Sequence, residues 1–232
     1  MIHRSRSDHR SRSGSSLIEV SISVMVIAIL MGVISESLTT SRDAYGQGMT
    51  SADVESLARR TLDGIATRMI GASASTLNID NPAPPAAPNV VTWLDYRPVV
   101  GYAGGPQLDP LSRIQLELYP NELDDGIDNN GNGLIDECRL VYLPDVVAGA
   151  PVVGLAGFVR RLAEGELPNG LDDNGDGNID EPGFQATWEP LAAAATGSRG
   201  GRLTLRITLE RSSGGPTPVL RSVQTLVRVR SQ

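Results

Sequence analysis

The chain has 232 residues, a formal net charge of −7, few aromatic residues, 25 glycines and 15 prolines. This composition allows one ordinary domain with a short additional element, and it predicts a core of Val, Leu and Ile rather than of aromatic rings. The acidic excess disfavours nucleic acid as a partner and favours cations. The single cysteine, Cys138, excludes a disulfide within the chain.

Residues 1–14 form a basic, serine-rich leader without large apolar clusters, which cannot fold alone. The leader holds both histidines of the chain, His3 and His9, and the chain has no lysine. Without the leader, no serine has an evident base to activate it. We therefore expect no enzymatic activity.

Residues 15–36 contain an apolar run from Leu17 to Ile34, interrupted by Glu19 and two serines. A helix of about 18–20 such residues crosses a hydrocarbon layer of ~30 Å. The arginines before the run predict a cytoplasmic N-terminus and a body outside. Two alternatives are a buried core helix and a secretory signal peptide, which needs a small-residue cleavage site after the run.

Residues 37–80 are predicted to hold a second, amphipathic helix. Gly46 and Gly48 interrupt the first helix, and residues 50–53 have the pattern of a capping box at the start of another. The apolar stripe of this helix is expected to pack on a sheet, the alternative being a partner-binding helix. The stripe consists of Val54, Leu57, Ala58, Thr61, Leu62, Ile65, Ala66 and Met69.

Residues 81–232 are expected to form a β-rich body after the proline-rich segment 81–89. Strands are predicted at 90–97, 114–118, 138–143, 203–210 and 219–230. The last two form a terminal hairpin with one buried face and one wet face of Arg and Thr. The fold class is therefore α+β, a long N-terminal transmembrane helix continuing to an amphipathic helix that packs on an antiparallel β-sheet.

The segment Gly14-Ser15-Ser16-Leu17-Ile18-Glu19-Val20 follows the basic leader and opens the apolar run. It resembles the signature of type IV prepilins, and the predicted architecture is pilin-like. The resemblance implies cleavage between Gly14 and Ser15 by a membrane aspartyl prepilin peptidase, followed by methylation of the new N-terminus. Ser15 and Ser16 depart from the Phe-Thr pair that is usual in the family.

Glu19 places a carboxylate in the apolar run, at a cost on the order of 2.5–3.5 kcal/mol on insertion scales. Its natural partner is the ammonium group that cleavage exposes. The resemblance implies that Glu19 pairs with the N-terminus of a neighbouring subunit and sets the register of assembly. The alternative is a glutamate that reaches the cytoplasmic interface.

The helical region, its arginines and the terminal hairpin resemble J-type minor pseudopilins of type II secretion and W-type minor pilins. The resemblance implies a structural subunit of a pseudopilus or pilus, with other pilin subunits, the peptidase and the membrane as partners. It implies a single pass through the bacterial inner membrane, with a periplasmic body, before assembly. A calcium-dependent adhesin or substrate-binding tip and a membrane-tethered enzyme are the alternatives.

Residues 122–137 and 166–181 repeat one pattern, with ten of sixteen positions identical and twelve of the 27 acidic residues of the chain. Each contains D-x-N-x-[ND]-G-x-I-D-E, which resembles the EF-hand-like calcium loops of extracellular proteins. Oxygen ligands without His or Cys favour Ca²⁺, and we expect one or two ions with a Kd of roughly 10⁻⁴–10⁻³ M.

Alternate side chains and one backbone carbonyl of each loop are the expected ligands. Arg139 and Gly183 stand where a full EF-hand has its last ligand, and Glu137 and Glu181, or Glu122 and Glu166, are its possible substitutes. Two other interpretations are a solvated turn and a glycosidase-like pair, Asp124/Asp125 or Asp172/Asp173. The expected ligands are Asp128, Asn130, Asn132, Leu134, Asp136, Glu137, Asp172, Asn174, Asp176, Asn178, Asp180 and Glu181.

Overall fold

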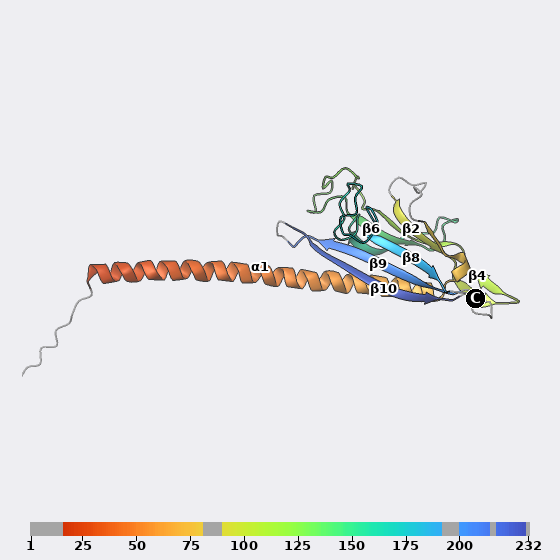
Figure 1. Ribbon diagram of the computed structural model, residues 1–232, viewed down its shortest axis with the longest axis horizontal. Helices are drawn as coiled ribbons and strands as arrows, with labels where there is room; N and C mark the ends of the chain where they lie inside the picture. Colours follow the sequence, from red (N-terminus) through yellow and green to blue (C-terminus); the bar gives the residue numbers. More distant parts are fainter. Residues whose placement is uncertain (1–15, 81–89, 192–199, 214–216, 231–232) are drawn as a thin grey trace, which may run out of the picture. The chain divides into compact units, whose positions relative to one another are not determined.

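The computed structural model describes residues 16–80, 90–191, 200–213 and 217–230. These residues form one long helix, a short 3₁₀ helix and ten β-strands (Figure 1). The chain divides into two compact units, an N-terminal unit, Met1–Tyr45, and a body, Gly46–Gln232.

Helix α1 runs without a break from Leu17 to Ile70. The prediction of a separate second helix beginning near Thr50 is therefore wrong. Thr50 does not cap a helix; its hydroxyl donates to the carbonyl of Gly46 at 3.0 Å, inside α1. Each glycine costs about 1 kcal/mol relative to alanine, and a long helix tolerates Gly46 and Gly48 because propagation is favourable once the helix has nucleated.

The part of α1 in the N-terminal unit exposes its apolar side chains. From Leu17 to Leu38 the large apolar side chains are between 49% and 84% exposed. They occupy most positions from Leu17 to Ile34, so they lie on every side of the helix. This part of α1 is long and apolar enough to cross a membrane.

The body is built on an antiparallel sheet in the order β1-β2-β5-β6-β7-β9-β10, with β8 also paired to β9. A separate pair, β3 and β4, and the 3₁₀ helix η1 (Ala74–Thr76) complete the described elements. The strands are β1 (Asn78–Asp80), β2 (Val90–Tyr96), β3 (Val99–Tyr102), β4 (Pro106–Leu108), β5 (Ser112–Leu118), β6 (Cys138–Leu143), β7 (Val153–Val159), β8 (Phe184–Pro190), β9 (Gly201–Arg211) and β10 (Val219–Val229).

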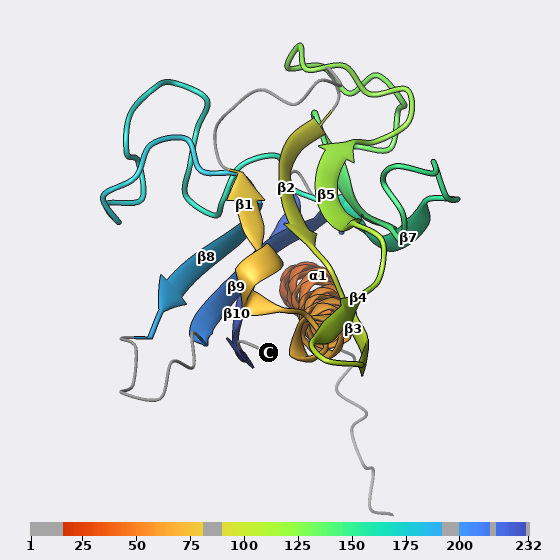
Figure 2. The same cartoon turned by 90° about the vertical axis from the view of Figure 1, so that its right-hand side faces the viewer.

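The C-terminal part of α1 packs on this sheet within the body, seen end-on in Figure 2. The predicted apolar stripe is confirmed as the contact, because six of its residues are buried and Leu57 and Ala66 are partly buried. The buried six are Val54, Ala58, Thr61, Leu62, Ile65 and Met69. They join inward residues of the sheet, such as Leu94, Leu116 and Ile207, in one core.

The predicted terminal hairpin is confirmed as β9 and β10, which pair from Val219↔Arg211 to Val229↔Gly201. Its predicted wet face is only partly wet. Thr208 and Glu210 are 0% and 6% exposed, although they lie on the same face as the exposed Arg202. The backbone of Arg160 donates to the carbonyl of Thr208 at 3.0 Å, so the segment after β7 lies along this end of β9.

We expect Leu62→Ala to lower the free energy of unfolding by about 2–5 kcal/mol, because Leu62 is 1% exposed and its loss leaves a cavity between α1 and the sheet. Arg59→Ala is the matched control, since this side chain is 64% exposed and its ion pair with Glu55 contributes about 0.5 kcal/mol or less. Denaturant unfolding of the chain in mild detergent measures both. Equal effects would contradict the packing.

Candidate functional site

The first turn of α1 is closed by a capping box. The N–H of Ser16 donates to Oε2 of Glu19 at 2.9 Å, and the N–H of Ile18 donates to the hydroxyl of Ser16 at 3.4 Å. The sequence carries this signal, Ser-x-x-Glu, at Ser16 and Glu19, although it was not among the features predicted from the sequence. Glu19 therefore has a donor within its own chain. Gly14 and Ser15, the predicted cleavage residues, lie outside the described residues.

The two serines of the apolar run are satisfied inside the helix. Ser21 donates to the carbonyl of Leu17 at 2.9 Å, and Ser23 donates to that of Glu19 at 2.8 Å. Their hydroxyl groups therefore need no water, which suits an apolar surrounding.

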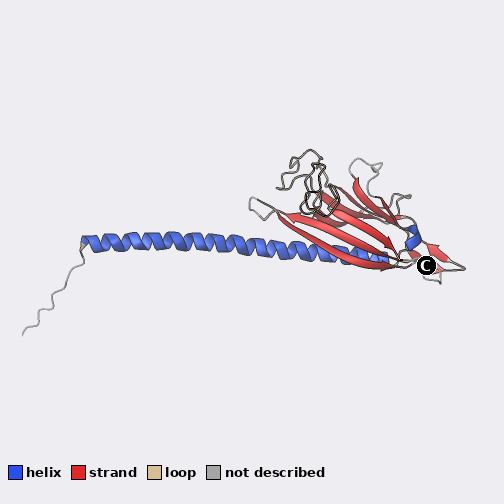
Figure 3. Cartoon of the chain, viewed as in Figure 1, coloured by secondary structure: helices blue, strands red, loops and turns tan. Residues whose placement is uncertain are grey.

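Two acidic loops project from the sheet of the body. The first acidic loop, residues 122–137, lies between β5 and β6, and the second, residues 166–181, lies between β7 and β8. Figure 3 shows both without helices beside them, and Figure 2 shows them apart, the first above β5 and the second above β8. The loops therefore offer two separate candidate sites.

The neck of each loop, where the chain enters and leaves it, is held by the same pair of backbone hydrogen bonds. Tyr119 donates its N–H to the carbonyl of Glu137 at 2.9 Å, and Ala163 donates to the carbonyl of Glu181 at 2.7 Å. The carbonyls of Tyr119 and Ala163 in turn accept the N–H groups of Glu122 and Glu166, at 2.9 and 3.2 Å. The sequence repeat is thus also a structural repeat.

The first aspartate of each motif organises the turn of its loop. Asp128 accepts the N–H groups of Gly131 and Gly133 at 2.6 and 2.8 Å, and Asp172 accepts the equivalent N–H groups of Gly175 and Gly177 at 2.6 and 2.9 Å. The pKa of Asp128 is lowered, mainly by the hydrogen bond that its carboxylate accepts from the N–H of Gly133.

Gly133 and Gly177 have φ angles of 86° and 97°, a backbone conformation that favours glycine. These glycines occupy the sharp turn that the motif predicts.

Asp136 and Asp180 turn away from the centre of their loops. Asp136 accepts the N–H groups of Asp125 and Gly126 at 3.2 and 3.0 Å. Asp180 accepts those of residues 169 and 170 at 3.3 and 2.9 Å. Both carboxylates therefore bind the first part of their loop, residues 125–126 or 169–170, which we call the upstream arm.

Glu122 and Glu166 are buried and bind backbone N–H groups. Glu122 accepts from Asn130 at 2.8 Å, and Glu166 accepts from Asn174 at 3.0 Å and from Asp180 at 3.1 Å. Each glutamate thus supports its loop from the side of the body.

Glu137 and Glu181 are the last acidic residues of the two loops, and they are 0% and 7% exposed. Oε1 of Glu137 accepts from the side-chain amides of Asn130 and Asn132, but Oε2 of Glu137 has no hydrogen-bond partner. Neither carboxylate oxygen of Glu181 has one. Burial raises the pKa of Glu181, and the adjacent carboxyl of Asp176 raises it further.

The expected backbone ligands keep their carbonyl groups available. The N–H of Leu134 donates to the side-chain oxygen of Asn132 at 2.9 Å, and the N–H of Asn178 donates to Asp176 at 3.1 Å. Neither carbonyl accepts a hydrogen bond from any residue that the structure describes.

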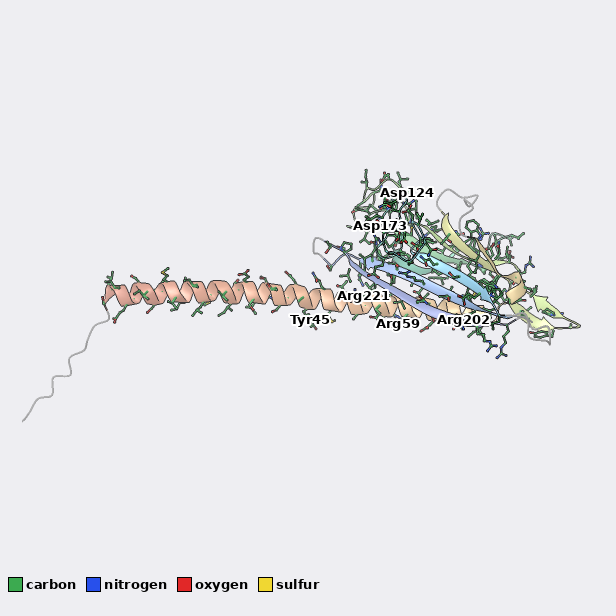
Figure 4. All side chains as sticks on the ribbon, viewed as in Figure 1. Tyr45, Arg59, Asp124, Asp173, Arg202 and Arg221 are labelled. Carbon is green, nitrogen blue, oxygen red and sulfur yellow. The ribbon has the colours of Figure 1, made fainter. Side chains whose placement is uncertain are left out.

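The carboxylate pairs considered as a glycosidase site are engaged in other contacts. Asp124 forms an ion pair with Arg161 at 2.6 Å, and Asp125 accepts the N–H of Ile127 at 3.0 Å. In the second loop, Asp173 accepts the N–H of Leu167 at 3.2 Å. Asp124 and Asp173, labelled in Figure 4, come from different loops.

The structure brings together some of the predicted ligands and separates others. It joins Glu137 with Asn130 and Asn132, and it places Asp176 beside Glu181. Within the described part of the chain, no three Asp, Glu, His or Cys side chains form a ready metal cluster. A cation site here would therefore need amide and carbonyl oxygens as well as carboxylates.

The first loop is coupled to the sheet through Glu210 of β9, which the sequence did not single out. Glu210 is 6% exposed, and one of its carboxylate oxygens has no hydrogen-bond partner. Burial raises the pKa of Glu210 to about 7; Arg160 opposes this shift and Glu137 adds to it.

Comparison of the chain with models of protein families, with curated proteins and with solved structures finds no match. The architecture is nevertheless pilin-like, because one long N-terminal apolar helix packs its C-terminal part on an antiparallel sheet. The fold is therefore the basis for a functional interpretation.

With calcium chelated, we expect the free energy of unfolding to fall as the pH rises from about 5 to 8. The native state keeps a proton on Glu210, with a pKa of about 7, that the unfolded chain releases near its ordinary value of 4.5. Glu210→Gln should remove this component, on the order of 2 kcal/mol at pH 8.

Denaturant unfolding across this pH range measures the effect. Glu164→Gln is the control, because Glu164 is exposed and lies outside the site. An unchanged pH dependence in Glu210→Gln would show that this carboxyl does not cause it.

Proposed function

We propose that this chain is a structural subunit, a minor pseudopilin or pilin, of a type II secretion pseudopilus or a type IV pilus. The observation that carries the proposal is the long helix, which is apolar on all sides in the N-terminal unit and packs on an antiparallel sheet in the body. In this role the chain crosses the inner membrane once and holds its body in the periplasm before assembly.

The exposed apolar side chains of α1 support this role. Side chains of this kind, 49% to 84% exposed over the stretch from Leu17 to Leu38, are unfavourable in water. Lipid surrounds them before assembly, and the helices of neighbouring subunits replace the lipid in a filament. Figure 4 shows these side chains along the helix.

Glu19 supplies the specific contact of assembly. Its capping bond to Ser16 uses Oε2, so the carboxylate still has acceptor capacity. Cleavage between Gly14 and Ser15 creates an ammonium group, and in a filament this group on one subunit pairs with Glu19 of the next. The attraction is strong there because the surrounding helices exclude water.

Calcium has a supporting role in this proposal. One or two Ca²⁺ ions bind the acidic loops, neutralise carboxylates that otherwise repel one another, and stiffen the body. The support for this role is the set of oxygen donors and the buried carboxylates without donors at the ends of both loops.

One observation favours a second candidate, a calcium-dependent adhesin or substrate-binding tip. The acidic loops expose large apolar side chains at equivalent positions of the repeat, each between 53% and 62% exposed. These are Leu123, Ile127, Ile135, Leu167, Leu171 and Ile179. Such side chains fit a contact with another protein, which a target or a neighbouring subunit would provide.

We expect Glu19→Gln to lower incorporation into the filament at least ~10-fold, which corresponds to about 1.4 kcal/mol. Glutamine keeps an oxygen for the capping bond with Ser16 but carries no charge to pair with the ammonium. The sheared filament fraction, quantified against total protein, measures the loss.

Glu36→Gln is the control for this substitution, because Glu36 is an exposed glutamate of the same helix. Incorporation of Glu19→Gln at the level of the unsubstituted chain would contradict the proposed assembly contact.

We expect the mature protein to begin at Ser15 and Gly14→Val to block cleavage, because a branched side chain prevents the close approach of the peptidase to the backbone. Intact-mass measurement of the protein from cells distinguishes the two forms. Arg12→Gln, which alters the leader but not the scissile bond, should still be cleaved. A mature protein that retains residues 1–14 would exclude this processing.

A further inference from the structure

Glu137 and Glu181 are buried at equivalent positions, and each has at least one carboxylate oxygen without a donor. Three of their four carboxylate oxygens have no hydrogen-bond partner, and both residues are at least nine-tenths buried. An ionised carboxylate in such surroundings is strongly unfavourable unless a positive charge accompanies it. The only ion pairs formed by the described residues of the acidic loops involve Asp124 and Asp176.

Backbone hydrogen bonds hold both glutamates at the C-terminal end of their loops. Each carbonyl accepts the hydrogen bond that closes the neck, from Tyr119 or Ala163. Each side chain then lies toward the inner residues of the motif, Asn130 and Asn132 in the first loop and Asp176 in the second. The same arrangement is therefore built twice, once between β5 and β6 and once between β7 and β8.

The neighbouring aspartates cannot take this place without losing their own contacts. Asp136 and Asp180 have φ angles of 50° and 49°, and both accept N–H groups of the upstream arm. The carboxylates of these aspartates are therefore engaged with residues 125, 126, 169 and 170, and not with the residues that contact the two glutamates. The alternation of the motif therefore ends before the ninth position of each loop.

The position of the last ligand in a full EF-hand is also closed. A side chain at Gly183 would overlap the carbonyl of Arg160. In the first loop, Arg139 occupies that position and pairs with Glu117 of β5 at 2.6 Å. A twelve-residue loop of the EF-hand type therefore cannot form at either site.

We propose that each acidic loop closes on a divalent cation through its tenth residue, Glu137 or Glu181, while Asp136 and Asp180 lock the upstream arm. This inference rests on the calcium binding proposed above and assigns its ligands. The remaining donors are Asp128, Asn130, Asn132 and the carbonyl of Leu134 in the first loop, and Asp172, Asn174, Asp176 and the carbonyl of Asn178 in the second.

The chemistry of these donors fits a hard cation. The amides of Asn130 and Asn132 now donate to Glu137, and a half-turn of each amide presents its oxygen to an ion instead. This turn gives up the bonds that the two amide oxygens accept from backbone N–H groups, and coordination of the ion has to offset that loss. With a bidentate glutamate, each loop then offers six oxygens, within the range that Ca²⁺ accepts. The second loop has three carboxylates among its donors and the first has two, so the second binds more tightly.

Calcium titration of the full chain in detergent, followed by calorimetry, tests the assignment. We expect the double variant Glu137→Gln/Glu181→Gln to lose at least ~10-fold in affinity at both sites, since even an outer partner of a metal ligand contributes that much. The matched control is Asp136→Asn/Asp180→Asn, which removes the same charge one residue earlier. It should keep its affinity within about 3-fold, because the one amide oxygen of each asparagine still accepts an N–H of the arm, that of Gly126 or Gly170.

The buried thiol of Cys138, next to Glu137, reports whether each variant is folded, since it stays unreactive toward maleimide only in the native body. If Cys138 becomes reactive in the double variants, the single variants Glu181→Gln and Asp180→Asn repeat the comparison in the second loop alone. Equal losses in the glutamate and aspartate variants, or full binding without the glutamates, would overturn the assignment. An unsubstituted chain that binds no calcium would instead refute the calcium role itself, while leaving the filament role intact.

Discussion

The structure depends on one helix that meets two different surroundings. From Leu17 to Leu38 the apolar side chains cover every side of α1, whereas from Val54 to Met69 only one stripe is buried. A helix satisfies its backbone groups internally, so the same element suits lipid in one part and a sheet in the other. Hydrogen bonding continues through Gly46 and Gly48, which lets a single element supply both the apolar segment and the centre of the core.

The sequence predicted the parts of the fold that depend on local periodicity. The buried stripe of α1 and the hairpin of β9 and β10 follow from spacings of 3.6 and 2 residues. Strands β7 and β8 were missed, because β7 contains Gly154 and Gly157 without clear alternation and β8 ends at Pro190. The burial of Thr208 and Glu210 was not predictable, since the segment that lies along them comes from after β7, about fifty residues earlier.

The candidate site shows the same limit. The motif identified Asp128 and Asp172, whose contacts depend on the glycines three and five residues later. It did not show whether Asp136 or Glu137 contacts the inner residues of the loop. The outcome depends on the N–H groups of Asp125 and Gly126, which bind the carboxylate of Asp136 and leave Glu137 for the inner residues. Spacing tells which side chains are able to converge, and the hydrogen bonds of the folded loop decide which of them do so.

The concentration of acid at the loops also explains why a cation would act on the whole body. Glu137 directly precedes β6, and its negative charge raises the pKa of Glu210 in β9. The charge of the first loop therefore acts on a residue inside the sheet. When both are ionised, these two carboxylates repel each other, and more strongly than they would in bulk water because both are buried. Arg160 and Arg161 offset only part of this repulsion, since Arg160 also binds the carbonyl of Ala163 and Arg161 pairs with Asp124. A divalent cation at the neck of the loop would remove this repulsion where the strands begin, and would therefore stabilise their pairing as well as the loop.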